Sequence, residues 1–193
     1  MCQAQSYFDQ GLKLLHCFWD FDAYRAFKEA ARLDPSAAMA YWGEFEALGF
    51  GRSGSMKDEK KAALDEAKSL AAKTSEHEQF YIRAAEHEDK ADDPKEGTAY
   101  QREMEALIDR YPDDLNAQTF LALGVMGGYE TDGHPREGEL YAQAILRTVL
   151  AGHPDNAAAN HYRIHDRIHA MEASSRPEAA LKSADATPTI SLI

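Results

Sequence analysis

The sequence predicts an all-α fold, a right-handed superhelical solenoid of antiparallel helical hairpins with about five imperfect repeats. Three observations predict it. Apolar residues recur at helical spacing along most of the 193 residues, and small and aromatic residues recur in a frame of about 34 residues. Proline closes this frame at Pro35, Pro112 and Pro154. We therefore expect one helical domain over residues 1–186, followed by an irregular C-terminal tail over 187–193.

The frame is most complete between Tyr7 and Pro35. Its positions match the glycine, large apolar residue, alanine, aromatic residue, alanine and proline of a tetratricopeptide (TPR) repeat, here Gly11, Leu14, Ala23, Phe27, Ala30 and Pro35. Small residues at Gly11 and Ala23 let two antiparallel helices approach closely, and Phe27 fills the space beside them. Proline stops the second helix because it has no backbone N–H to donate.

In the first half of the chain, helical spacing predicts helices over about 4–18, 22–33, 37–49 and 59–73, and a further helix after Ser75. Asp20 and Asp22 interrupt the apolar pattern and are expected to cap the second helix. Ser75 and Glu78 have the spacing of a capping box, in which each side chain accepts a hydrogen bond from the other residue's backbone N–H.

In the second half, the same spacing predicts helices around Tyr100–Leu107, over 115–126, around Ala142–Val149, over 155–173 and, weakly, over 177–186. Long loops interrupt the repeats at 49–58 and 127–138, and insertions in solenoids often gather on the binding face. The loop over 49–58 is rich in glycine, but it lacks the GKS or GKT ending of a phosphate loop and follows no strand. We therefore do not expect it to bind phosphate.

The chain is acidic, with 21 basic and 33 acidic residues and a net charge of −12. This charge repels phosphate, which argues against nucleic acid or an anionic membrane as partner and favours a basic peptide or a metal cation. Alternatively, the excess charge only keeps the protein soluble. There is no apolar run long enough for a transmembrane span.

Met1 is followed by polar residues rather than by a signal peptide. We expect a cytoplasmic protein, or an exported one if a leader has been removed before Cys2. Cys2 and Cys17 form no CxxC pair and no disulfide framework, and Cys17 is expected in the core of the first helix.

A histidine-rich helix is the one place where the sequence suggests site chemistry. His161, His165 and His169 are four residues apart, so neighbouring pairs lie on one helical face about 6 Å apart along the axis, as in helical zinc sites. His165 and His169, with Glu172 one turn beyond, are the best candidate ligands for a divalent transition metal such as zinc. His161 is a further candidate, although about 12 Å of axial rise separates it from His169.

Two other interpretations of this helix remain open. The histidines could be ordinary polar residues on the inner face, or they could serve a metal-dependent hydrolase. Nothing supplies a nucleophile triad, because Ser174 and Ser175 have no evident base beside them.

Larger segments extend the resemblance beyond the generic repeat. The chain resembles a family of bacterial TPR proteins, often exported and mostly without assigned activity, over QGLKLLHCFWDFDAYRAFKEAARLDPSAAMAYWGEFEALG, RYPDDLNAQTFLALGVM, LYAQAILRTVLAGHPDNAAANHYRIH and AMEASSRPEAAL. The resemblance extends to about Ala186, with the family's Asn-His-Tyr-x-Ile-His element at Asn160 to His165. Two departures are four extra residues, Asp166 to His169, and the absence of a later histidine-containing segment.

The function predicted from these patterns is a scaffold that binds a protein or peptide in the concave groove of the solenoid. Aromatic candidates for groove or packing positions are Tyr7, Tyr41, Tyr81, Tyr100 and Tyr162. The alternatives are a metal-binding protein or metal-dependent hydrolase that uses the histidine helix, and a shortened copy without activity of its own. Since no polar capping helix closes the repeats, a second copy of the chain is a candidate partner at the C-terminal end.

Overall fold

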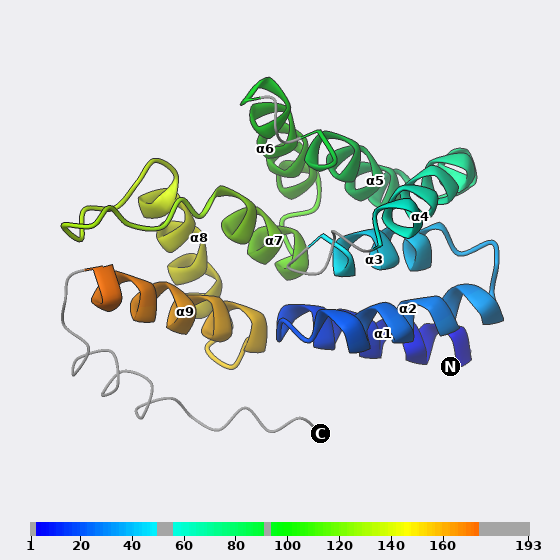
Figure 1. The fold of residues 1–193 in the computed structure, drawn as a ribbon, viewed down its shortest axis with the longest axis horizontal. Coiled ribbons are helices and arrows are strands. Elements are labelled where there is room, and N and C mark those ends of the chain that lie inside the picture. Colours follow the sequence, from blue (N-terminus) through cyan, green and yellow to red (C-terminus); the bar gives the residue numbers. More distant parts are fainter. Residues whose placement is uncertain (1–2, 50–55, 91–93, 174–193) are drawn as a thin grey trace. The chain divides into compact units, whose positions relative to one another are not determined.

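The computed structural model describes residues 3–49, 56–90 and 94–173, and within them the chain is all-helical, as predicted (Figure 1). The α-helices of this part are α1 (Gln3–His16), α2 (Asp20–Leu33), α3 (Ala38–Ala47), α4 (Lys57–Leu70), α5 (Glu76–Glu88), α6 (Pro94–Arg110), α7 (Leu115–Val125), α8 (Glu139–Gly152) and α9 (Ala157–Ala173). A short 3-10 helix, Ala71–Lys73, continues α4. The helix expected over 177–186, the tail over 187–193 and most of the glycine-rich loop lie outside the described residues.

The chain divides into two compact units, Met1–Tyr111 and Pro112–Ile193. In the first unit, consecutive helices pack as pairs, α1 on α2, α3 on α4 and α5 on α6, and α2 also packs on α3. The first helices of these pairs contact one another as well, because both α1 and α5 lie against α3. In the second unit α8 packs on α7 and α9, and α7 also contacts α9.

Phe27 of α2 is the centre of the packing between α1, α2 and α3. Its side chain is fully buried, and its ring meets Phe8 edge-on at a centroid distance of 5.5 Å. Gly11 of α1 and Gly43 of α3 face this ring, and a Cβ on Gly11 would lie only 2.8 Å from it. A Cβ on Gly43 would lie closer still. Two glycines therefore let neighbouring helices close on one aromatic ring, whose burial contributes about 2–3 kcal/mol.

The core of the second unit joins α7, α8 and α9 through aliphatic and aromatic side chains. Leu121 of α7, Leu146 and Val149 of α8 and Tyr162 of α9 are all at most 2% exposed. Fully buried alanines, Ala117, Ala122, Ala142 and Ala159, allow the helices to approach between these larger side chains.

Several expected helix boundaries need correction. Asp20 and Asp22 do not cap α2 but lie in its first turn, because the Ala23 N–H already bonds the Trp19 carbonyl at 2.9 Å. Their charges still favour this end of the helix, since the helix N-terminus carries partial positive charge. The third helix ends at Ala47, with Leu48 as its C-cap, rather than at Gly49.

Other boundaries follow local chemistry. The capping box at Ser75 and Glu78 is confirmed, with the Glu78 N–H bonded to the Ser75 hydroxyl and the Ser75 N–H bonded to the Glu78 carboxylate. Cys17 lies in the turn after α1 and is half-buried, so the prediction that it belongs to the core was wrong. Among the described helices, none is long and apolar enough to cross a membrane.

Candidate functional site

The predicted histidines all lie on α9, in the second unit. The rings of His161 and His165 meet edge-on with centroids 4.7 Å apart, whereas those of His165 and His169 are tilted and 6.2 Å apart. The His169 Nδ1 lies 3.1 Å from the Glu172 carboxylate, and both side chains are exposed. His165 therefore has an imidazole neighbour on either side, and its closer neighbour is His161.

The surroundings of His165 favour its neutral form. Partial burial, followed by the proximity of His161 and His169, lowers the pKa of His165. A neutral imidazole is the form that binds a metal. Within residues 3–49, 56–90 and 94–173, however, no three histidine, cysteine, aspartate or glutamate side chains are gathered as a metal site. The described part of α9 thus offers neighbouring imidazoles rather than a closed coordination shell.

A largely buried polar cluster includes Asp166 of the same helix, and sequence reasoning missed it. We call it the Glu139 cluster, and its members are Tyr129, Glu139, Gln143 and Asp166. The Tyr129 hydroxyl donates to Asp166 Oδ1 at 2.6 Å and accepts from the Gln143 amide at 2.8 Å. The Glu139 and Asp166 carboxyl groups lie close enough for Asp166 to raise the pKa of Glu139. The cluster therefore connects the loop over 127–138 with α8 and α9.

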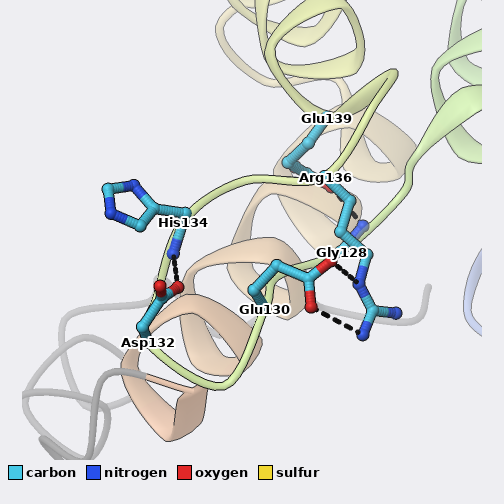
Figure 2. Close-up of polar contacts among 6 residues, drawn as sticks. All are labelled: Gly128, Glu130, Asp132, His134, Arg136 and Glu139. Atoms are coloured by element: carbon cyan, nitrogen blue, oxygen red, sulfur yellow. Dashed lines mark hydrogen bonds and ion pairs between the residues drawn. The ribbon is translucent and has the colours of Figure 1, made fainter.

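The loop over 127–138 has a defined backbone, part of which Figure 2 shows. Tyr129 pairs with Pro135 as an isolated antiparallel bridge, and the Arg136 N–H bonds the Gly128 carbonyl at 2.9 Å. The Gly128 N–H bonds Glu139 Oε2 at 2.8 Å, while Glu130 and Arg136 form an exposed ion pair at 3.1 Å (Figure 2). The Glu139 carboxyl group therefore binds one end of the loop through the Gly128 N–H.

Glycine is required where this loop meets α8. Gly138 has φ 84°, in the left-handed region that side chains disfavour, and a Cβ there would collide with the carbonyl oxygen of Val125. Gly138 is also the residue immediately before α8. Its conformation directs Glu139 inward as the first residue of the helix.

Burial decides the charge state of Glu139, whose side chain is fully inaccessible. Burial is the main cause that raises its pKa to about 7, and contact with Asp166 adds to it. The Gly128 N–H opposes the shift. The helix N-terminus also favours the carboxylate, by about 0.3–1 kcal/mol, but removing an ion from water costs several kcal/mol. The cost of desolvation therefore exceeds the effect of the helix N-terminus, and the pKa of Glu139 is raised.

In the described part of the first unit, Glu44 and Glu46 are also buried. Burial raises the pKa of Glu44 to about 7, against the opposing charge of Lys28. Burial and the neighbouring Glu88 raise the pKa of Glu46 well above its ordinary value, although Lys60 opposes the shift. The molecule therefore buries acid groups in both units.

The sequence did contain a signal for the Glu139 cluster. Glu139 shares the apolar stripe of α8 with Ala142, Leu146 and Val149, at spacings of three, four and three residues. A carboxyl group on such a stripe has to be buried, and a buried carboxyl group requires a partner. Attention to polar residues at core positions would have identified Glu139 as a buried acid, although not its partners in the loop and α9.

Comparisons with known proteins give no assignment, since no family model, no curated protein and no solved structure matches this chain. The resemblance to bacterial TPR proteins therefore remains a prediction based on the sequence pattern.

Proposed function

We propose that this chain is a helical-repeat module of the TPR type, a right-handed solenoid that binds a protein or peptide in a concave groove. The packing of Gly11, Phe27 and Gly43 supports this most directly, because it places one aromatic ring between the helices of one hairpin and the first helix of the next. The contacts of both α1 and α5 with α3 extend the same relation along the first unit. Stacked hairpins of this kind bury a continuous core and leave one face for ligands.

The favoured ligand is an extended peptide of positive charge. The net charge of −12 raises the local concentration of cationic partners and repels anionic ones. Long-range attraction of this kind is screened by salt, with a Debye length of about 8 Å at physiological ionic strength. Binding should therefore weaken steeply as salt is added.

A peptide titration tests the proposal. Labelled extended peptides with a lysine- and arginine-rich sequence are compared, by fluorescence anisotropy, with peptides of the same length in which glutamate replaces the basic residues. We expect saturable 1:1 binding of a subset of the basic peptides, weakened at least about tenfold between 50 and 500 mM salt. No saturable binding of either set to folded protein would contradict the peptide-binding proposal.

The histidine helix supports a second candidate function, the binding of a divalent transition metal. Two adjacent imidazole pairs share His165, and its lowered pKa leaves it neutral and able to coordinate. Such a pair would occupy only part of a coordination shell, with water or a partner supplying the rest.

Metal binding by the histidine helix can be measured directly. The protein is incubated with zinc, nickel or copper and desalted, and its metal content is determined. If the pair binds, His165→Gln should abolish retention, whereas His153→Gln, at the exposed end of α8, should leave it unchanged. Retention lost in His161→Gln but kept in His169→Gln would assign the closer ring pair, and the reverse result would assign the pair next to Glu172. Retention that survives His165→Gln would refute a histidine-helix site.

A further inference from the structure

We propose that Glu139 is a proton-operated latch: its neutral carboxyl group holds the loop over 127–138 against α9, and its ionised form releases the loop. This inference is independent of the proposed peptide and metal binding. It rests on a closed chain of contacts between three elements. The Gly128 N–H of the loop bonds Glu139 Oε2, the Glu139 carboxyl group meets Asp166 of α9, and Asp166 accepts the Tyr129 hydroxyl of the loop at 2.6 Å.

This geometry needs a proton between the two carboxyl groups. Two carboxylates offer only acceptors to each other, so a hydrogen bond between Glu139 and Asp166 forms only while one of them is protonated. Glu139 is fully inaccessible, whereas Asp166 is 5% exposed and already accepts a hydrogen bond from Tyr129. Glu139 is therefore the group that keeps the proton and donates a hydrogen bond to Asp166.

Loss of this proton turns the contact into repulsion. Ionised Glu139 would face the oxygen atoms of the Asp166 carboxyl group in a buried site, where electrostatic repulsion is strong. The loop takes part in this cluster through Gly128, which bonds Glu139, and through Tyr129, which bonds Asp166 and Gln143. Separation of the loop lets water reach Glu139.

The charges around Glu139 do not offset this repulsion. Asp166 faces it from α9, and Tyr129, whose pKa burial and Asp166 raise, faces the same cluster from the loop. Gln143 contributes an amide from α8. The remaining packed helix, α7, contains no titratable residue from Leu115 to Val125. Glu130 and Arg136 of the loop are exposed and bond each other.

Backbone amide exchange on the full chain tests the latch at pH 5.5 and 8.5, after correction for the pH dependence of chemical exchange. The amides to follow are those of Gly128 and Arg136, whose N–H groups are hydrogen-bonded in the closed loop. Since burial raises the pKa of Glu139 to about 7, most of the latch is open at pH 8.5. We expect corrected exchange of these amides to be at least about tenfold faster there.

Glu139→Gln cannot ionise and can still accept the Gly128 N–H, so its loop should remain protected at both pH values. Glu130→Gln and His134→Gln are matched controls in the same loop, both at exposed positions, and each should keep the pH dependence of the parent chain. Loop protection that is equal at pH 5.5 and 8.5 in the parent chain would overturn the proposal. So would a pH dependence that persists in Glu139→Gln.

A measurement without substitution covers the case in which Glu139→Gln does not fold. The carboxyl carbon of Glu139 can be titrated by NMR in the unmodified chain, beside the exchange of the loop amides. The latch requires the two midpoints to coincide. A loop transition with a different midpoint would assign the opening to another group and overturn the proposal.

Discussion

Gly43 lies so close to the Phe27 ring that the chain has no room for a side chain there. We expect Gly43→Ala to lower the free energy of unfolding by about 1–3 kcal/mol, because overpacking forces the buried ring or the helix backbone to move. Urea denaturation followed by far-UV circular dichroism measures the change.

Gly97→Ala is the matched control for this substitution. It also replaces a helical glycine by alanine, but nothing lies within 4 Å of the added methyl group. The control should be neutral or stabilising by up to about 1 kcal/mol, since alanine is the better helix former. Equal effects of the two substitutions would mean that the Phe27 contact does not limit stability.

The same residues show what the repeat frame could and could not predict. Gly11 and Phe27 belong to one repeat, so their contact followed from the spacing alone. Gly43 was missed because the frame aligns Gly11 with Phe45, which is itself fully buried. A contact between two imperfect repeats depends on the register of their packing, and sequence spacing within one repeat does not specify that register.

At the scale of the helix, the capping box of α5 should contribute measurable stability. Ser75→Ala removes the acceptor for the Glu78 N–H and should cost about 1 kcal/mol. Ser69→Ala is the control, because its hydroxyl bonds only the Glu66 carbonyl within α4 and its loss leaves no helix end uncapped. Amide exchange in the first turn of α5 should rise only in Ser75→Ala, and equal exchange in both variants would count against the cap.

Helix interiors and caps were predictable to different degrees. Apolar periodicity located most of the helices to within a few residues, although α6 begins at Pro94, six residues before the predicted Tyr100. The Ser75–Glu78 spacing specified a cap because both bonds are local. Asp20 was misassigned because a backbone bond to Trp19 starts α2 earlier, and any residue can supply such a bond. The Glu139 cluster was missed because its members come from a loop and two helices, and no local pattern brings them together.

At the scale of the whole molecule, the buried carboxyl groups predict a protein that is more stable at mildly acidic than at alkaline pH. Burial raises the pKa of both Glu44 and Glu139 from an ordinary value of 4.5 to about 7. Below about pH 4.5 folded and unfolded chains both hold these protons, so the contribution is complete. As the pH rises through 7, unfolding becomes more favourable because it releases each carboxylate into water.

Thermal unfolding between pH 5 and 8 tests whether stability falls as the pH rises. We expect the midpoint to fall as the pH rises, corresponding to a loss on the order of 1–3 kcal/mol. Glu44→Gln should flatten the curve for the unit Met1–Tyr111, and Glu139→Gln should do so for Pro112–Ile193. Glu130→Gln, an exposed control, should leave the slope unchanged. A midpoint that rises over this interval would contradict the assignment of buried neutral acids.

The position of Phe27 has a consequence for how the chain is made. Synthesis runs from the N-terminus, so α1 and α2 leave the ribosome before α3. Helix α3 carries Gly43, which packs against the Phe27 ring. Until residues 38–47 have emerged, one side of this ring faces solvent. The first hairpin therefore cannot complete its own core, and the smallest segment that can mature during translation extends through α3.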